Sequence, residues 1–404
     1  MPEQRNVSHE VVIDTTPEMA FEALTEGREM REWFCDEAWT QVRPGGRYDI
    51  RWNQGYRADG TFTELDPPHR ATVEWQGSGE PDTTTLAFVI EPAGTRRRVT
   101  VVHDGFGAGT DWDEALAQAE RGWSVGLQNL KSTLETGVDL RVVRQPFLGI
   151  SFDLLTPERA AREGIAAERG IYVLGTLEDS GARRAGVEQG DVIVALGGIE
   201  TSDYETVREA LRTHCAGDVV ELDMVRGQIR EARRIELGQR PQVEVPGSAR
   251  ALADRLAEQL EAANAELSAA LEDVTEQEAD HKPAPGEWSA KEVLAHLSAG
   301  ERGLHFYLVG LAVNGWLDAG GIDPDAFPGQ LVAVLASAPT VEALRARFFT
   351  DEQETVTLLR GLPNETVAHK ARFRRICEAV QYSPDHVREH VTQIVAALES
   401  VRGS

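Results

Sequence analysis

The sequence predicts a multidomain α+β protein in three parts: an α+β domain of helix-grip type, a small β-barrel-like domain and an all-α four-helix bundle. Three observations predict this order. The first third alternates apolar and polar residues over short stretches, as half-buried strands do, before one long amphipathic stretch. The middle has short apolar runs interrupted by glycines. The last part repeats leucine at helical spacing, at Leu252, Leu256, Leu260, Leu267 and Leu271.

The length, charge and cysteine content limit the classes of protein to consider. A chain of 404 residues is too long for one core, so we expect domains at 1–140, 141–242 and 246–404. The net charge of −26 argues against nucleic acid and against anionic membrane surfaces as partners. Three cysteines are far apart and odd in number, and the first residues lack the apolar run of a signal peptide. We therefore expect a cytoplasmic protein.

In the first domain, residues 9–14 alternate as a strand, and Thr16 is placed to cap a helix that Pro17 begins. A second short helix is expected to end at Trp33 and Phe34. The clearest alternation then predicts strands at 48–52, 71–75, 85–90 and 98–103. A long amphipathic helix from Asp113 to Leu134 closes the domain. His103, at the end of a predicted strand, is expected to be solvated.

This order of elements, with the spacing of Phe21, Leu24 and the Trp33-Phe34 pair, resembles the START-like (SRPBCC) superfamily, in the branch related to the activator of the heat-shock-protein-90 ATPase. The resemblance implies a sheet curled round the long helix and an apolar cavity for a small apolar ligand. Ordinary core packing is the alternative for each aromatic residue. The candidates to line the cavity are Trp33, Trp52, Tyr56, Trp75 and Trp123.

The middle domain contains the stretch 145–150, Gln-Pro-Phe-Leu-Gly-Ile, followed by glycine-punctuated apolar runs at 170–174 and 190–193. This order resembles the HtrA-like PDZ domains. The resemblance implies that a C-terminal peptide of a protein partner adds as a strand, with its carboxylate held by backbone N–H groups of the loop. The implied peptide-binding residues are Phe147, Leu148, Gly149, Ile150, Val207 and Leu211. A mere spacer is the alternative, and no Gly-x-Ser-x-Gly segment of a protease accompanies the domain.

Two histidines in the last part of the chain are the strongest candidates for a metal site. His386 and His390 are four residues apart on a helix that Ser383 and Pro384 begin, so they share one face. Two imidazoles so placed can hold one transition metal, although such a pair is often only surface decoration. The best third ligand is His296, on a helix that starts with the capping box of residues 289–292.

The segments around these histidines resemble the DinB-like four-helix bundles. Trp288 and Ser289 precede a helix that carries His296, and the pair His386–His390 precedes Gln393-Ile394. The resemblance implies a divalent transition metal, zinc or nickel, held by His296, His386 and His390. It also implies, for several branches, a low-molecular-weight thiol and S-transfer. The departure from the family is Pro384, which predicts a break in the last helix.

Two further residues of the bundle have expected roles. Glu292, one turn before His296, is a candidate to orient an imidazole. Cys377 is interpreted as a buried apolar filler.

Two hypotheses of different classes remain. In the first, the protein is a metal-dependent thiol transferase whose PDZ-like domain recruits a protein. In the second, it is a non-enzymatic adaptor or chaperone-associated binding protein with a structural or vestigial metal site. The three histidines favour the first hypothesis, and the lack of any other acid–base constellation favours the second.

Overall fold

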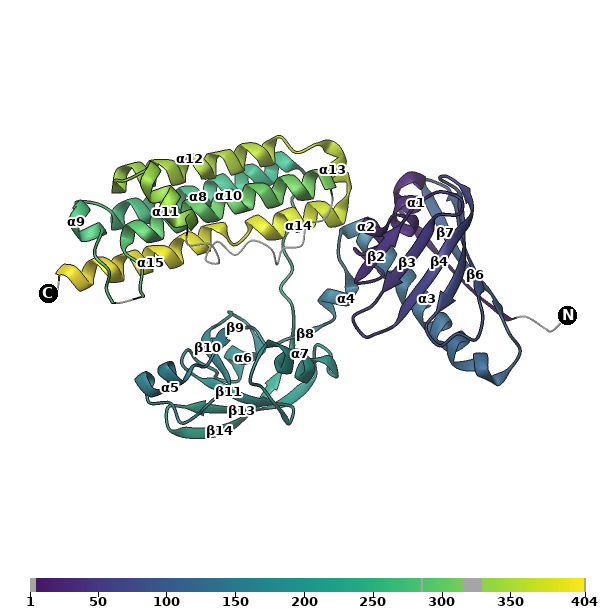
Figure 1. Ribbon diagram of the computed structural model, residues 1–404, viewed down its shortest axis with the longest axis horizontal. Coiled ribbons are helices and arrows are strands. Elements are labelled where there is room, and N and C mark those ends of the chain that lie inside the picture. Colours follow the sequence, from purple (N-terminus) through teal and green to yellow (C-terminus); the bar gives the residue numbers. More distant parts are fainter. Residues whose placement is uncertain (1–4, 285, 315–328, 403–404) are drawn as a thin grey trace. The chain divides into compact units, whose positions relative to one another are not determined.

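The computed structural model describes residues 5–284, 286–314 and 329–402 (Figure 1). By its internal contacts the chain divides into two units, one made of Met1–Val138 with Val243–Ser404 and the other of Asp139–Gln242. None of the helices among the described residues has the length and apolar character needed to cross a membrane.

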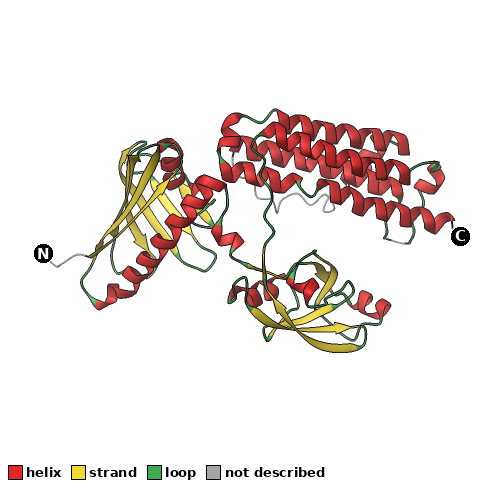
Figure 2. Ribbon diagram, turned by 180° about the vertical axis from the view of Figure 1, so that it is seen from behind, coloured by secondary structure: helices red, strands yellow, loops and turns green. Residues whose placement is uncertain are grey.

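The N-terminal part is one antiparallel sheet with a long helix against it (Figure 2). The strand order is β1-β7-β6-β5-β4-β3-β2. The strands are β1 (Arg5–Ile13), β2 (Glu37–Thr40), β3 (Arg47–Arg51), β4 (Arg57–Asp66), β5 (Arg70–Gly77), β6 (Thr84–Ala93) and β7 (Arg96–Phe106). The helices are α1 (Pro17–Thr25), α2 (Gly27–Met30), the 3-10 turn Thr110–Trp112 and α3 (Asp113–Thr136). Trp123, Leu127 and Leu130 of α3 share one buried core with the sheet.

Two local expectations for this part differ from the structure. The short helix α2 ends at Met30, before Trp33 and Phe34, which lie in a turn. Trp33 is buried and its Nε1 donates to the carbonyl oxygen of Ala23 at 2.8 Å, so it anchors the turn to the core. Strands β2 and β4 lie outside the ranges that alternation predicts, because β4 buries only two apolar side chains, Ala58 and Phe62, over ten residues.

The middle unit is a small sheet with the strand order β14-β13-β11-β10-β9, in which β12 pairs with β11 and β15 pairs with β8. The strands are β8 (Pro146–Phe147), β9 (Ile150–Leu154), β10 (Ile171–Thr176), β11 (Val192–Leu196), β12 (Ile199–Glu200), β13 (Val219–Arg226), β14 (Ile229–Glu236) and β15 (Gly238–Gln239). The helices are α4 (Leu140–Val143), α5 (Pro157–Glu163), α6 (Gly181–Arg184) and α7 (Tyr204–Arg212). Strand β9 forms one edge of the sheet, where an added strand would pair.

The C-terminal part is a bundle of long helices lying side by side (Figure 1). They are α8 (Ala249–Ala270), α10 (Ala290–Asn314), α12 (Val341–Arg360) and a last helix split into α14 (Lys370–Val380) and α15 (Ser383–Arg402). Short helices are α9 (Glu276–Ala279), α11 (Gly329–Ser337) and α13 (Asn364–Ala368). The predicted starts are confirmed by side-chain caps: Ser248 and Thr340 each accept from a backbone N–H at 3.1 Å.

The buried apolar side chains of the bundle fall into two clusters. One contains Leu267 of α8, Leu294 of α10 and Phe348 of α12, and the other contains Leu256, Leu308 and Val356 of the same three helices. The residues between the two clusters along α10 and α12 include four buried polar ones, Glu301, Asp351, Glu352 and Thr355. A layer of polar groups therefore crosses the core of the bundle.

Candidate metal centre

Three histidines from two helices converge in the bundle. His296 comes from α10, and His386 and His390 come from α15. One ring nitrogen of each lies within 4.8 Å of those of the other two. The ring centroid of His296 lies 5.6 Å from that of His386 and 4.8 Å from that of His390. The residues that the sequence predicts as ligands are thus brought together in the structure.

The local sequence explains why these helices present the histidines. Helix α15 begins anew at Ser383, after an interruption at Gln381 and Tyr382, and so keeps His386 and His390 one turn apart on one face. Helix α10 starts with the predicted capping box: Ser289 N–H donates to Oε2 of Glu292 at 2.9 Å. The other oxygen of Glu292 accepts from Lys282 at 2.7 Å. Glu292 therefore caps the helix, and a role for it in orienting an imidazole stays a prediction.

The centre is buried on one side and open on the other. His296 is buried, His390 is half-buried and His386 is exposed. The ring of His386 is only partly removed from water, and this, followed by the charges of His390 and His296, lowers the pKa of His386 to about 4. The imidazole of His386 is therefore neutral at pH 7, which is the form that offers a lone pair to a metal.

The side chain of Gln393 determines which ring nitrogen of His390 can offer a lone pair to a metal. The Nδ1 atom of His390 lies 2.9 Å from the side-chain oxygen of Gln393, one helical turn further along α15. A carbonyl oxygen only accepts, so Nδ1 carries the proton and Nε2 keeps its lone pair. The sequence signal for this partner is its spacing of three residues from His390.

A groove adjoins the three histidines. Trp288, whose ring is 4.8 Å from that of His296, and Gln393 both line a hollow of about 560 Å³. The remaining lining residues are Pro283, Gly286, Glu287, Ala396 and Ala397. Trp288 and Gln393 therefore connect the imidazoles with a space for a small ligand.

The donor set fits a transition metal of the borderline-soft class. Three imidazoles suit zinc, nickel, copper or iron and leave at least one position for water or a thiolate. Two other candidate groups of the bundle lie elsewhere. Nε2 of His305 is 2.7 Å from the hydroxyl of Thr355, and burial raises the pKa of Cys377 to about 12. Cys377 is thus a buried filler, as the sequence predicts.

The aromatic candidates of the N-terminal part pack against one another. Trp33, Trp75 and Trp123 are buried, whereas Trp52 and Tyr56 are half-buried. The ring centroids of Trp75 and Trp123 are 6.3 Å apart, and those of Trp52 and Tyr56 are 5.3 Å apart. These side chains share one aromatic core, and a cavity among them stays a prediction.

His103 is buried, so the expectation that it is solvated is wrong. Only 1% of its surface is exposed, because residues 99, 101 and 103 of β7 alternate toward the inner face. Its Nδ1 accepts from Nε1 of Trp123 at 3.2 Å, and its Nε2 lies 2.8 Å from the hydroxyl of Thr84. Burial lowers the pKa of His103 to about 3.

In the middle unit, the predicted peptide-binding residues surround the loop between β8 and β9. Leu148 and Val207 are buried in one core, against which Ile150 and Leu211 pack. The carbonyl oxygens of Leu148 and Gly149 accept from Ala182 and Leu177, at 3.2 and 2.9 Å. Within the described part of the chain, the N–H groups of Leu148 and Gly149 donate no hydrogen bond.

Gly149 is required by the loop itself. Its φ is +78°, and a Cβ there would lie 2.2 Å from Cβ of Ser180. Replacing Gly149 therefore disturbs the packing of the loop whether or not a peptide binds.

Three family models match separate parts of the chain. Residues 14–135 match the "Activator of Hsp90 ATPase homolog 1-like protein" family, 146–237 the "PDZ domain" family and 259–394 the "DinB superfamily". The chain combines three domain families. The resemblances predicted from the sequence are confirmed in their order and in the regions they cover. We call the parts the START-like domain, the PDZ-like domain and the DinB-like bundle.

The curated relatives are bacterial serine proteases. The chain is 29% identical over 127 residues to "Periplasmic serine endoprotease DegP" of Escherichia coli, which is 31% of this chain and 27% of that protein. It is 29% identical over 114 residues to the "Periplasmic pH-dependent serine endoprotease DegQ" of the same species, 27% of this chain and 25% of that protein. The chain thus spans about a quarter of the length of these relatives.

Solved structures are similar to about a third of the chain. The "Aha1 dimer from Colwellia psychrerythraea" is 26% identical, with a TM-score of 0.29, covering 32% of this chain and 96% of that chain. Protein MLL2253 from Mesorhizobium loti is 22% identical, with a TM-score of 0.29 and the same coverage of each chain.

Proposed function

We propose that the protein is a metal-dependent thiol transferase, with its reactive centre at His296, His386 and His390. The observation that carries this proposal is the convergence of three ring nitrogens within 4.8 Å, on a site whose one side is exposed. A divalent zinc or nickel ion held there supplies the positive charge that keeps a thiol ionised at neutral pH.

The residues of the chain have separate roles in this proposal. Gln393 keeps the proton of His390 on Nδ1, so that Nε2 faces the centre. The groove beside Trp288 and Gln393 holds the electrophile and excludes part of the water around it. A low-molecular-weight thiol approaches from the side of His386, which is the exposed imidazole.

We further propose that the domains divide at 1–140, 141–242 and 246–404, and that the protein works in the cytoplasm. The proposal of a cytoplasmic location rests on the three free cysteines, two of them buried, which suit a reducing compartment. The START-like domain would hold a small apolar ligand against its aromatic core.

The test compares two histidine variants of the full chain. His386→Ala combined with His390→Ala should abolish binding of zinc or nickel and the transfer of a small thiol to a chromogenic electrophile. His305→Ala is the matched control, because this ring hydrogen-bonds elsewhere, and it should retain both. Equal metal content in the two variants would overturn the metal site, and metal without transfer would favour the adaptor hypothesis.

The adaptor hypothesis is supported by its own observation, the two N–H groups of Leu148 and Gly149 at the end of strand β9. Backbone donors in such a position are suited to a terminal carboxylate. A free peptide ending in an apolar residue should bind the full chain, and its C-terminal amide should bind about tenfold more weakly. Equal binding of the two peptides would rule out carboxylate recognition.

A further inference from the structure

A second group of titratable side chains lies inside the DinB-like bundle, away from the three histidines. Asn264 of α8, Glu301 of α10 and Asp351 and Glu352 of α12 belong to the polar layer between the two apolar clusters. The three carboxyl groups are buried, and Glu352 is only 1% exposed. Burying a carboxyl group is costly unless its charge and its hydrogen bonds are compensated.

Compensation is present for two of the three carboxyl groups. Asp351 accepts from the hydroxyl of Ser298 and lies 3.7 Å from Nε of Arg302. Glu301 accepts from the hydroxyl of Thr355 at 2.6 Å, and Thr355 in turn contacts His305. These bonds direct Asp351 toward α10 and leave it with a cationic neighbour.

Glu352 is compensated on one oxygen only. The side-chain nitrogen of Asn264 donates to Oε2 of Glu352. Oε1 of Glu352 and Oδ1 of Asn264 are both buried and have no hydrogen-bond partner among the described residues. Two acceptor oxygens without a donor, in the interior of a bundle, are the groups that a bound cation would satisfy.

We propose that Asn264, Glu301 and Glu352 form a second cation site, which takes a hard divalent ion such as Mg²⁺, Ca²⁺ or Mn²⁺. All of its donors are oxygens, which these ions prefer, whereas the three histidines offer only nitrogen. Two carboxylates balance the charge of one divalent ion. The two sites of the bundle therefore differ in the class of metal that each selects.

The charges around the layer make this binding depend on pH. Burial, and then the nearby charge of Glu301, raises the pKa of Glu352 to about 8, and burial also raises the pKa of Glu301. The other charged groups facing the layer are Asp351, Arg302 and His305. A proton therefore occupies Glu352 at neutral pH in the absence of the ion, and binding the ion releases it.

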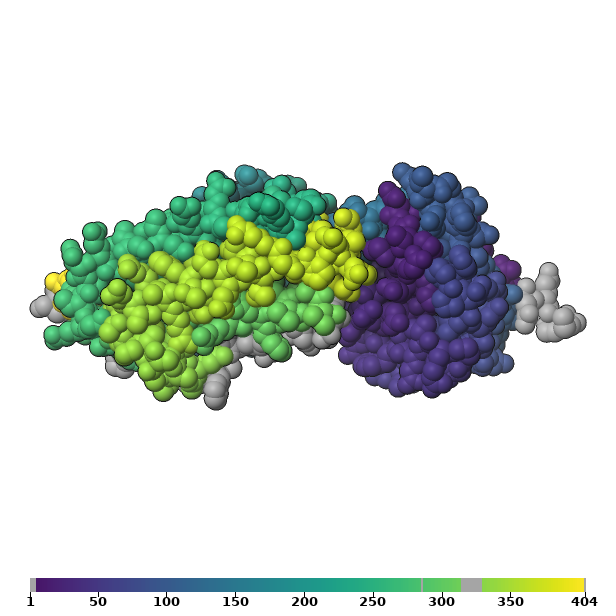
Figure 3. Space-filling view, turned by 90° about the horizontal axis from the view of Figure 1, so that it is seen from above, coloured from purple at the N-terminus to yellow at the C-terminus, as the bar shows by residue number. Residues whose placement is uncertain are grey.

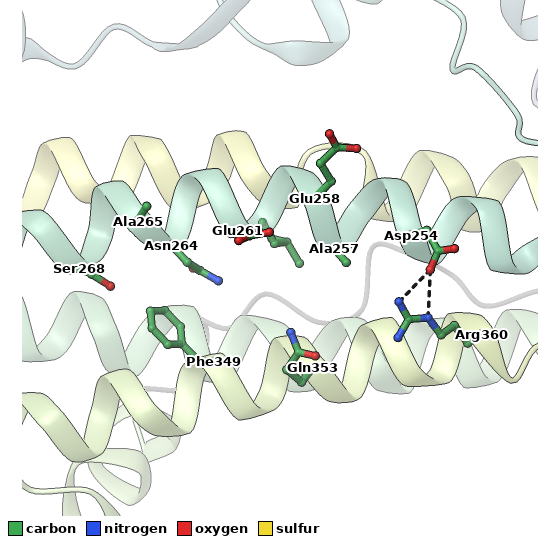
Figure 4. Close-up of a pocket in the computed structure, with 11 residues that line it drawn as sticks. Asp254, Ala257, Glu258, Glu261, Asn264, Ala265, Ser268, Phe349, Gln353 and Arg360 are labelled. Carbon is green, nitrogen blue, oxygen red and sulfur yellow. Dashed lines mark hydrogen bonds and ion pairs between the residues drawn. The ribbon is translucent and has the colours of Figure 1, made fainter.

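A groove between α8 and α12 gives access to the layer. These helices lie side by side at the surface of the bundle (Figure 3). The groove measures about 630 Å³ and is lined by Asn264, with Phe349 and Gln353 on the opposite helix (Figure 4). Figure 4 shows the side chain of Asn264 directed from α8 toward α12, with Glu261 on the same helix, whereas Glu258 points away from α12.

The test uses the full chain carrying His386→Ala and His390→Ala, so that the nitrogen site is removed. Titration with Mn²⁺, followed by electron paramagnetic resonance, should show one bound ion per chain that Mg²⁺ and Ca²⁺ displace. Adding Glu352→Gln should weaken Mn²⁺ binding at least tenfold. Glu354→Gln is the matched control, since this carboxylate is two residues away on α12 and 63% exposed, and it should leave binding unchanged.

The outcomes are separable. No bound Mn²⁺ in the His386→Ala, His390→Ala chain, or equal binding in the Glu352→Gln and Glu354→Gln variants, would overturn the second site. Binding should strengthen from pH 6 to pH 8 with release of a proton, and binding independent of pH would contradict the role of Glu352. Glu352→Gln resembles the protonated side chain and is expected to fold; Glu301→Gln provides the second variant if it does not. The result is independent of the thiol-transfer proposal, because the histidine pair is absent throughout.

Discussion

His103 of the START-like domain and His390 of the DinB-like bundle differ in how their two ring nitrogens are used. Nδ1 of His103 accepts from Trp123, so its lone pair is already engaged, and its other nitrogen contacts Thr84. In His390 the partner is an acceptor, the amide oxygen of Gln393, to which Nδ1–H donates, so the lone pair of Nε2 stays available. A histidine is suited to bind metal when its partner accepts a hydrogen bond from one ring nitrogen, and to a structural role when a partner donates a hydrogen bond to its free lone pair.

The largest expected effect concerns His103. Replacing it with alanine removes the acceptor of Trp123 and leaves a cavity in the aromatic core, so the free energy of unfolding should fall by about 3 kcal/mol. Urea denaturation measures this loss, and His69→Ala, at an exposed histidine, is the control. Unchanged metal content in His103→Ala would support a purely structural role for His103. A loss of bound metal without loss of stability would contradict that role.

A smaller effect is expected at Glu352, a buried group with one oxygen engaged and one not. Burial raises the pKa of Glu352 from its ordinary value of 4.5 to about 8 in the folded chain. Between these pH values the folded chain holds a proton that the unfolded chain releases, so the free energy of unfolding should fall as the pH rises from about 4.5 to 8. Glu352→Gln should remove this slope and stabilise the protein by about 2 kcal/mol at pH 8 in a chelator. Parallel pH profiles of the two proteins, followed by urea denaturation, would be evidence against a raised pKa.

The smallest effect is expected at Gln393. Gln393→Leu keeps the size of the side chain but removes the acceptor, so both tautomers of His390 become accessible and the affinity for zinc should fall about tenfold. Gln393→Glu restores an acceptor and should recover most of that affinity. Calorimetric titration with zinc measures both variants. Identical affinities in all three proteins would mean that the tautomer of His390 is set by other contacts.

The pairing of His386 and His390 could be predicted from helical geometry, whereas His296, on another helix, was supported as third ligand by the resemblance to the DinB-like bundles. The spacing of His386 and His390 and the capping box of α10 are local properties of the sequence, and helix starts at Ser248, Ser289 and Thr340 follow from caps. The break before Pro384 follows from the missing N–H of proline in the same way.

The buried polar groups could not be predicted as easily, because a polar residue is assigned to the surface by default. Val99, Val101 and His103 alternate inward in β7, although a polar residue at the end of a predicted strand is expected to be solvated. Glu301 falls four residues after Leu297 and seven before Leu308, at the spacing of the buried face of α10. That spacing alone indicates that Glu301 lies on the buried face of the helix. The partners Asn264 and Glu352 come from two other helices, and no local pattern joins them.

The interruption between α14 and α15 has a consequence for the order in which the bundle melts. Helix formation is cooperative only along an unbroken ladder of backbone hydrogen bonds. Pro384 supplies no N–H to that ladder, and α14 and α15 each close their own bonds on either side of Gln381 and Tyr382. The twenty residues of α15, with both imidazoles, therefore form a separate helical segment. Fraying that starts in α14 stops at Pro384. The amide hydrogens of α15 should therefore exchange with water at rates that are independent of those in α14.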